Sequence, residues 1–280
     1  MGRCAATTGG LPSPGVEHDE NARIDGPRTL AIDIGGSGLK AIVLTPDGEM
    51  ASERTRRETP YPCTPPVLLE ELTALVATQP DHDRVSVGFP GAIRGGRVRE
   101  VPAFSRRGPG LPPDPELVAM WTGFDLETAL AGRFARPTRV ANDADVQGCA
   151  VISGRGMELV ITLGTGIGCA VFFDGRLLPH MELSHGTFGG TSIEVACGDN
   201  ERHKIGKEAW RKRVLEALDA FEAMVLPDHL YIGGGNAKKL DPDTIGPNRT
   251  IVPNISGLLG GIALWERTGD TPPVPTAAAS

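Results

Sequence analysis

Closely spaced cysteines are missing from this sequence of 280 residues. Its five cysteines are odd in number and far apart, and no two stand in a Cys-x-x-Cys spacing. Disulfide frameworks and zinc knuckles both depend on such close spacings, so neither kind of small stapled domain is indicated. The pattern is typical of a protein from a reducing compartment.

Long apolar runs and an excess of positive charge are also missing. The longest uncharged apolar run, Leu159–Phe173, is shorter than the ~20 residues that a membrane span needs. Residues 1–27 contain no apolar segment of the kind found in secretory signals. The net charge of −7 argues against a dedicated nucleic-acid binder. We therefore expect a cytoplasmic protein that has neither a membrane nor a nucleic acid as its partner.

Glycine and proline, by contrast, are abundant, with 37 and 24 residues. Residues 1–27 and 271–280 are aperiodic and rich in proline and small residues, so both are predicted to be disordered tails. Between the tails, apolar residues are frequent enough for a substantial core. There the chain shows two halves of the same order, a β-hairpin with a glycine turn followed by a helix.

Periodicity and capping residues predict the elements of an α/β protein. The predicted strands are Thr29–Ile34, Leu39–Leu44, Met50–Arg56, Arg84–Phe89, Thr138–Ala141, Glu158–Leu163, Ile167–Phe173 and Asp228–Ile232. The predicted helices are Thr64–Ala77, Asp125–Phe134, Asn142–Ser153, Ile205–Val225 and Ser256–Arg267. Residues 105–115 are expected to form a basic loop rich in proline and glycine.

A first glycine cluster, DIGGSGLK at residues 33–40, lies between two predicted strands. Walker A and Rossmann loops lead into a helix, so this cluster is neither of them. Consecutive glycine N–H groups can still surround a phosphate, and the Asp33 carboxylate suits a water-mediated Mg²⁺ contact. An ordinary glycine-rich hairpin is the alternative. The predicted phosphate-binding residues here are Asp33, Gly35, Gly36, Ser37, Gly38 and Lys40.

Two further glycine clusters lie at strand ends. One is the turn of the second hairpin, and the other follows the last predicted strand, where a helix is expected to begin. A helix N-terminus is a favourable place for an anion. Three clusters at strand ends are hard to explain as turns alone, so together they predict binding of one phosphate chain. The residues concerned are Gly164, Thr165, Gly166, Gly233, Gly234 and Gly235.

Five motifs occur in a fixed order: DIGGSGLK, ANDAD, TLGTGIGCAV, ELSHG and IGGGNAKK. In this order the sequence resembles the ROK family of sugar kinases, and its spacing is most similar to the polyphosphate glucokinase branch. The resemblance covers about residues 29–267. It implies the actin-like ATPase (ribonuclease H-like) fold, with two α/β domains around a cleft. The first domain would comprise residues 29–140 and the helix 256–268, and the second residues 141–255.

The resemblance also implies site residues. Asp143 takes the place of the family's catalytic base, which accepts the proton of the attacking sugar hydroxyl. Asn142 and Asp143 also suit a helix N-cap, which is the structural alternative. Glu182 and His185 match the family's sugar-contacting Glu-x-x-His pair. Glu194 falls where the polyphosphate branch has a second sugar-binding glutamate.

Departures from the family pattern leave the sugar open. Only Cys197 and His203 stand where many ROK kinases carry a cysteine-rich zinc motif, so no zinc site is expected. Residues 98–107 lack the asparagine that contacts the sugar in the family, and Ala103 or Phe104 stands in its place. Glucose specificity is therefore uncertain at this position.

The expected activity is transfer of a phosphoryl group, from polyphosphate or ATP and with Mg²⁺, to the 6-hydroxyl of glucose. Mannose or an N-acetylated amino sugar is the alternative acceptor. A non-catalytic, sugar-binding regulator is the alternative function, but the regulators of this family carry an N-terminal helix-turn-helix, for which residues 1–27 are too short. The resemblance also suggests a homodimer.

Overall fold

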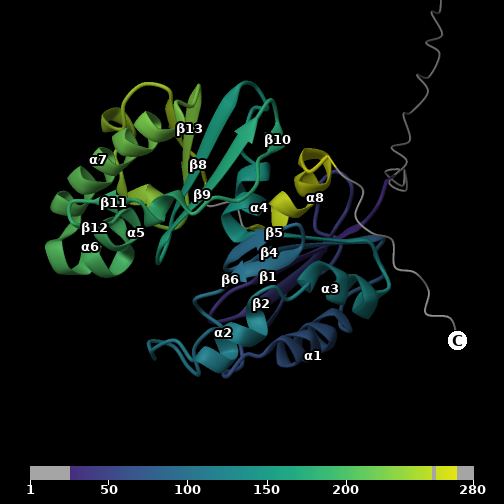
Figure 1. The fold of residues 1–280 in the computed structure, drawn as a ribbon. Helices are drawn as coiled ribbons and strands as arrows, with labels where there is room; N and C mark the ends of the chain where they lie inside the picture. Colours follow the sequence, from purple (N-terminus) through teal and green to yellow (C-terminus); the bar gives the residue numbers. More distant parts are fainter. Residues whose placement is uncertain (1–25, 254–256, 270–280) are drawn as a thin grey trace, which may run out of the picture.

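The computed structural model describes residues 26–253 and 257–269. The predicted tails therefore lie almost wholly outside the described residues. Figure 1 shows two lobes, each built around its own β-sheet, with helices α4 and α8 between them.

The sheet of the first lobe has five strands in the order β3-β2-β1-β4-β7. β1, β2 and β3 form an antiparallel meander, while β1, β4 and β7 run parallel. All the residues of β7 and most of those of the other long strands are buried, which explains their continuous apolar sequence. The strands are β1 (Thr29–Ile34), β2 (Leu39–Leu44), β3 (Thr55–Arg57), β4 (Arg84–Phe89) and β7 (Thr138–Asn142).

The sheet of the second lobe repeats this plan, with the order β10-β9-β8-β13-β14. β8 and β9 form the antiparallel hairpin, and β13 runs parallel to both β8 and β14. The glycine clusters predicted at the two hairpin turns therefore occupy equivalent places in the two sheets. The strands are β8 (Met157–Leu163), β9 (Ile167–Phe173), β10 (Arg176–Leu177), β13 (His229–Gly233) and β14 (Arg249–Ile251).

Helices α1 (Pro65–Val76), α2 (Pro115–Trp121) and α3 (Leu126–Phe134) belong to the first lobe. The N-cap predicted for α1 is confirmed, because the Thr64 hydroxyl accepts the N–H of Val67 and proline occupies the first helical position. Helix α2 was not predicted, although Asp114 caps it in the same way. Its Trp121 is buried and donates its indole N–H to the Cys63 carbonyl at 2.8 Å.

The second lobe carries α5 (Ile193–Cys197), α6 (Asp199–Ile205) and α7 (Lys207–Val225). The prediction of one helix over residues 205–225 is wrong at its start, because Ile205 ends α6 and α7 begins at Lys207. Gly206 separates the two helices with a φ of 83°, a conformation that only glycine adopts at little cost. Buried Trp210 ties α7 to α5 through a 2.7 Å hydrogen bond to the Cys197 carbonyl.

Helices α4 (Asp143–Cys149) and α8 (Gly257–Arg267) pack against each other between the lobes. Gly260 of α8 permits this approach, because a Cβ there would overlap the carbonyl oxygen of Val146. Gly261 accepts a hydrogen bond from the buried Ser86 hydroxyl of β4 at 2.5 Å. The last helix of the chain therefore packs on the first sheet, and Ser256, its predicted first residue, lies outside the described residues.

Several shorter elements differ from the predictions. The third strand is confined to β3, with an isolated bridge between Leu44 and Met50, and α4 ends at Cys149 instead of continuing to residue 153. The remaining elements are β5 (Ala92–Arg94), β6 (Arg97–Glu100), β11 (Thr187–Phe188), β12 (Thr191–Ser192) and the 3-10 turns Leu183–His185, Ala237–Lys239 and Pro242–Thr244. No helix among the described residues is long and apolar enough to span a bilayer.

Candidate active site

A cleft of about 600 Å³ is lined by residues from both lobes. The first lobe contributes the loop after β4, the end of β6 with the loop after it, and the end of β7. The second lobe contributes the β8–β9 turn, the loop before α5, the first turn of α5 and the loop after β13. Most of the predicted site residues meet here although they are far apart in sequence. The predicted residues that line the cleft are Asn142, Asp143, Gly164, Thr165, Gly166, Glu182, His185, Glu194, Gly234 and Gly235.

Asn142 and Asp143 lie at the junction of β7 and α4, and they divide two roles between them. Asn142 is the N-cap, since its side-chain oxygen accepts the Ala144 N–H at 2.8 Å and its amide donates to the Gly91 carbonyl at 3.1 Å. The predicted structural alternative therefore applies to Asn142. Asp143 follows as the first helical residue, and its Oδ1 also accepts the Ala144 N–H, at 2.9 Å.

The environment of Asp143 makes it a stronger base than a surface carboxylate. Burial raises its pKa to about 6, and the negative charge of Asp33 on β1 acts in the same direction. A carboxylate of this pKa is still mostly ionised at neutral pH, yet it accepts a proton more readily than an unperturbed aspartate. The arrangement is suited to general base catalysis.

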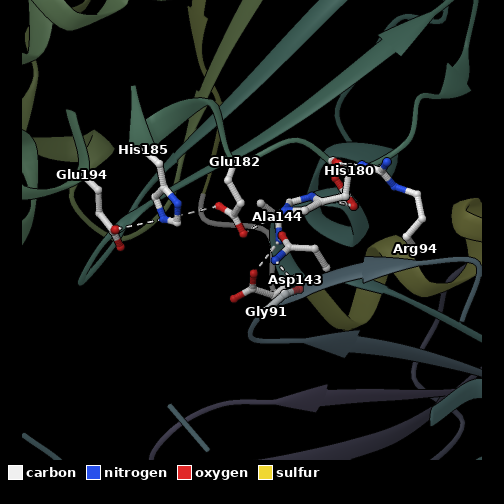
Figure 2. A network of polar contacts seen from close by, with 10 residues as sticks. Gly91, Arg94, Asp143, Ala144, His180, Glu182, His185 and Glu194 are labelled. Carbon is white, nitrogen blue, oxygen red and sulfur yellow. Dashed lines mark hydrogen bonds and ion pairs between the residues drawn. The ribbon is translucent and has the colours of Figure 1, made fainter. Parts of the chain in front are cut away.

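Three more predicted residues form a row along the second-lobe side of the cleft (Figure 2). The Nε2 atom of His185 lies 3.4 Å from the carboxylate of Glu194 and 3.9 Å from that of Glu182. Glu194 also packs against the glycine turn, because a Cβ on Gly166 would lie 2.5 Å from its Oε1. Two carboxylates and an imidazole in a row offer the acceptors and donors that a sugar's hydroxyl groups require.

Two residues that sequence reasoning missed, Asp145 and His180, lie directly behind this row. His180 Nδ1 is 3.0 Å from Asp145 Oδ2, and its Nε2 is 3.1 Å from Glu182 Oε1. Both Asp145 and His180 are buried. A charged residue two positions after Asp143 was the available signal, since a carboxylate on the buried face of a helix needs a partner.

The β8–β9 turn and the loop after β13 are joined by Asn236, another residue that was not predicted. Its amide nitrogen donates to the Gly164 carbonyl at 2.8 Å and to Asp199 Oδ1 at 3.0 Å, and its oxygen accepts from Lys239. Gly234 has a φ of 83° and lies against the backbone of β8, where a Cβ would be 2.5 Å from the Leu163 carbonyl oxygen. Glycine is required there for backbone approach.

One prediction about this region is wrong. The glycine cluster Gly233–Gly235 was expected to lead into a helix, but it leads into the single 3-10 turn Ala237–Lys239. Gly233 itself is the last residue of β13. The anion site offered by a helix N-terminus is therefore not formed, and any phosphate contact must use the turn's own N–H groups and nearby cations.

The β1–β2 turn is a tightly held hairpin at the edge of the first lobe's sheet. The Gly35 N–H donates to the Gly38 carbonyl at 3.0 Å, and the hydroxyls of Thr59 and Tyr61 donate to the carbonyls of Gly35 and Gly36. These bonds occupy the carbonyl groups of Gly35, Gly36 and Gly38 within the first lobe. The residues of this turn are not among the described residues that line the cleft: Gly35, Gly36, Ser37 and Gly38.

Asp33 and Lys40 lie opposite each other on β1 and β2 and form an ion pair of 2.7 Å. The charge of Asp33 acts on Asp143, so the two carboxylates lie near each other, although Asp33 is not among the residues that line the cleft. Mg²⁺ commonly uses one or two carboxylates together with water and substrate phosphates, without a complete protein cage. Asp33, reached through water, fits a Mg²⁺ ion of this kind.

No group of three or more His, Cys, Asp and Glu side chains in the described part of the chain is arranged to hold a metal. Cys197 is buried in the core of the second lobe, and its thiol donates to the Arg213 carbonyl at 3.7 Å. His203 lies on α6, where its Nδ1 contacts the Asp199 carbonyl at 2.8 Å. The two residues considered for zinc therefore serve separate local contacts.

The loop after β6 shows which side chains stand where the family's asparagine was expected. Phe104 is fully buried and packs edge-on against Phe89, with ring centroids 5.9 Å apart, so it does not face the cleft. Glu100, Pro102 and Arg106 line the cleft in this region instead. Arg106 is held by the carbonyl groups of Pro102 and Leu111.

The two equivalent sheets, the helices between them and the cleft define a protein of the actin-like ATPase class. The sequence pattern of the ROK family matches residues 29–204, and the chain belongs to this family. It is a ROK family sugar kinase, so both the predicted fold class and the resemblance are confirmed.

Three relatives illustrate the similarity. The polyphosphate glucokinase of Mycobacterium tuberculosis (strain ATCC 25618 / H37Rv) is 29% identical over 247 residues, covering 82% of this chain and 88% of that protein. The N-acetylmannosamine kinase of Escherichia coli (strain SMS-3-5 / SECEC) is 35% identical over 222 residues, covering 76% and 68%. The crystal structure of the inorganic polyphosphate/ATP-glucomannokinase from Arthrobacter sp. strain KM superimposes with a TM-score of 0.70 at 30% identity, covering 85% of this chain and 97% of that one.

Proposed function

We propose that the protein transfers a phosphoryl group from polyphosphate or ATP to the 6-hydroxyl of a hexose, with Asp143 as the general base. One observation carries this proposal: Asp143 lines the same cleft as the Glu182–His185–Glu194 row and the glycines of the β8–β9 turn and of the loop after β13. A sugar bound to the row would present a hydroxyl to Asp143, and a donor bound at the turns would present its terminal phosphoryl group.

Each side chain then has a defined task. Asp143 accepts the hydroxyl proton while the sugar oxygen attacks the phosphorus. Glu182, His185 and Glu194 orient the sugar, which lowers the entropic part of the barrier. Asp33 would hold a Mg²⁺ ion through water, and the ion would supply positive charge close to the donor's phosphate oxygens.

Cationic residues beside the second-lobe turns support a polyanionic donor. Burial lowers the pKa of Lys239, and the nearby positive charges of Arg202, Lys238 and Lys207 lower it further against the opposing effect of Asp199. Such crowding of positive charge costs free energy in the unbound protein and is relieved by a bound chain of phosphates. The relatives that use polyphosphate give the same indication.

The acceptor sugar is the less defined partner. Glu100 and Arg106 border the cleft where the family's asparagine was expected, so charged groups stand close to the sugar's side of the site. We propose glucose as the first acceptor, with mannose and N-acetylmannosamine as the alternatives suggested by the relatives.

The test is a two-way panel in which glucose, mannose and N-acetylmannosamine are each offered with polyphosphate and with ATP. Sugar phosphate is measured directly, and kcat/KM is compared across the panel. We expect turnover of at least one hexose with polyphosphate and Mg²⁺. Turnover with ATP but none with polyphosphate would refute the polyphosphate assignment. No turnover with any pair of sugar and donor would refute phosphoryl transfer to a hexose.

A further inference from the structure

His180 connects the sugar-binding row to the helix that carries Asp143. Its imidazole stands between two carboxylates, with Nδ1 3.0 Å from Asp145 Oδ2 and Nε2 3.1 Å from Glu182 Oε1. Figure 2 shows His180 behind Glu182, on the side away from His185. Because both partners are carboxylate oxygens, the imidazolium form, in which both nitrogens donate, matches them.

The charge of His180 is set by its surroundings. Burial alone lowers the pKa of an imidazole, but the hydrogen bonds to Asp145 and Glu182 outweigh it and raise the pKa of His180 to about 10. Those same bonds hold the pKa of Glu182 below its usual value. At neutral pH His180 is therefore a cation, and it donates a hydrogen bond to the ionised Glu182 at the end of the row.

Asp145 fixes the far end of this connection. It is 2% exposed, and its Oδ1 atom has no hydrogen-bond partner among the described residues. A buried carboxylate in this state depends on its one ion pair, because an uncompensated buried charge is strongly unfavourable. His180 cannot turn away from Asp145 without leaving that charge unpaired, so the imidazole is held in one orientation.

The backbone of His180 is held as well. The guanidinium of Arg94, from strand β5 of the first lobe, donates to the His180 carbonyl at 2.7 Å. Asp145 and Asp143 both belong to α4, two residues apart. The His180 side chain therefore fixes the position of Glu182 relative to α4, the same helix that presents the general base.

We propose that His180 is a positioning residue, which holds the Glu182 carboxylate toward the acceptor's hydroxyl groups in a fixed relation to Asp143. Its proton is not transferred in the reaction. One oxygen of Glu182 receives the His180 N–H, and the other is left to accept from the sugar. This role rests on the proposed function, because it assumes that Glu182 binds the acceptor.

Two amide variants separate the two bonds of His180. The side-chain nitrogen of asparagine reaches the place of Nδ1, so His180→Asn can keep the contact with Asp145 but not the one with Glu182. The nitrogen of glutamine reaches the place of Nε2, so His180→Gln can donate to Glu182 but not to Asp145. His229→Gln, on strand β13 with its ring against Thr250, is the matched control.

We expect His180→Asn to raise the hexose KM by about tenfold, the usual effect of losing a hydrogen bond to a charged group, and to leave the KM of the phosphoryl donor unchanged. His180→Gln should recover part of this loss even though it lacks the Asp145 contact. Combined with Glu182→Gln, His180→Asn should add no further rise in hexose KM. His229→Gln should behave as the parent protein in all these measurements.

A purely structural role would give a different pattern. Thermal midpoints would fall while the hexose KM stayed at its parent value, or the effects of His180→Asn and Glu182→Gln would multiply, and either result would overturn the positioning role. Hexose binding measured by calorimetry separates the two proposals. If the parent protein binds a hexose in a His180-dependent manner but shows no turnover, the proposed phosphoryl transfer fails and the positioning role stands.

Discussion

The acid limb of the pH–rate profile should report the protonation of Asp143. A general base must be ionised, and burial together with the charge of Asp33 raises the pKa of Asp143 to about 6. With that pKa, about nine tenths of the carboxylate is ionised at pH 7 and about one tenth at pH 5. We therefore expect kcat/KM to fall about tenfold between these two pH values and about tenfold for each further unit of acidity.

Asp33→Asn is the perturbation that tests this origin. It removes the negative charge that disfavours the ionised form of Asp143, and it leaves the positive charge of Lys40 without its partner at 2.7 Å. Both changes stabilise the ionised base, so the pKa of Asp143 falls and the acid limb moves to lower pH. The variant also loses a candidate Mg²⁺ contact, which lowers the rate at every pH but does not move the midpoint of the limb.

The assay is kcat/KM for the hexose between pH 4.5 and pH 8, about the range in which an imidazole or a perturbed carboxylate titrates, at saturating donor and Mg²⁺. Asp243→Asn, an exposed carboxylate of the second lobe, is the control and should leave the profile unchanged. Asp143→Asn should lower kcat by about 10²–10⁴-fold and remove the limb. A limb that stays in place in Asp33→Asn, or that persists in Asp143→Asn, would refute the assignment.

Three further outcomes follow from close contacts in the structure. Gly234→Ala should reduce the stability by about 1–3 kcal/mol, measured as a lower thermal midpoint, because it strains a positive φ and places a Cβ against the β8 backbone. Gly235→Ala should leave the midpoint unchanged, because a Cβ there meets open space. Gly260→Ala should destabilise the α4–α8 contact, whereas Gly132→Ala, in an open position on α3, should be neutral or slightly stabilising in the same melting experiment. Asn236→Ala should raise the donor KM more than the hexose KM, because it releases the carbonyl of the β8–β9 turn; equal rises in both would contradict its placement at the donor end.

Local rules were sufficient for much of the fold. Thr64 followed by two prolines begins α1 where predicted, and the long strands agree with their predicted spans to within a residue. Local rules were insufficient where a tertiary contact or the backbone conformation of one residue determines where an element begins or ends. The helix predicted from Ile205 begins instead at Lys207, because Gly206 has a positive φ and separates it from α6. The helix expected after Gly235 is replaced by a single 3-10 turn, which follows the packing of Gly234 against β8.

The candidate site shows the same division. The motifs named Asp143, Glu182 and His185, and the resemblance to the family added Glu194, but a motif does not show which of its polar residues are partners. His180 stands in no motif, and its importance comes from a contact with Asp145, which is 35 residues away in sequence.

The sequence by itself determined the family, the order of the long strands of the two sheets, and the residue types that reach the cleft, because these depend on local patterns and short motifs. Only the tertiary structure decided how charge is distributed among them. It partly buried Asp143 within reach of the charge of Asp33, which raises the pKa of this proposed general base, and it placed His180 between two carboxylates. The physical reason is that desolvation and Coulomb energy depend on distances through space, which the spacing along a chain does not specify.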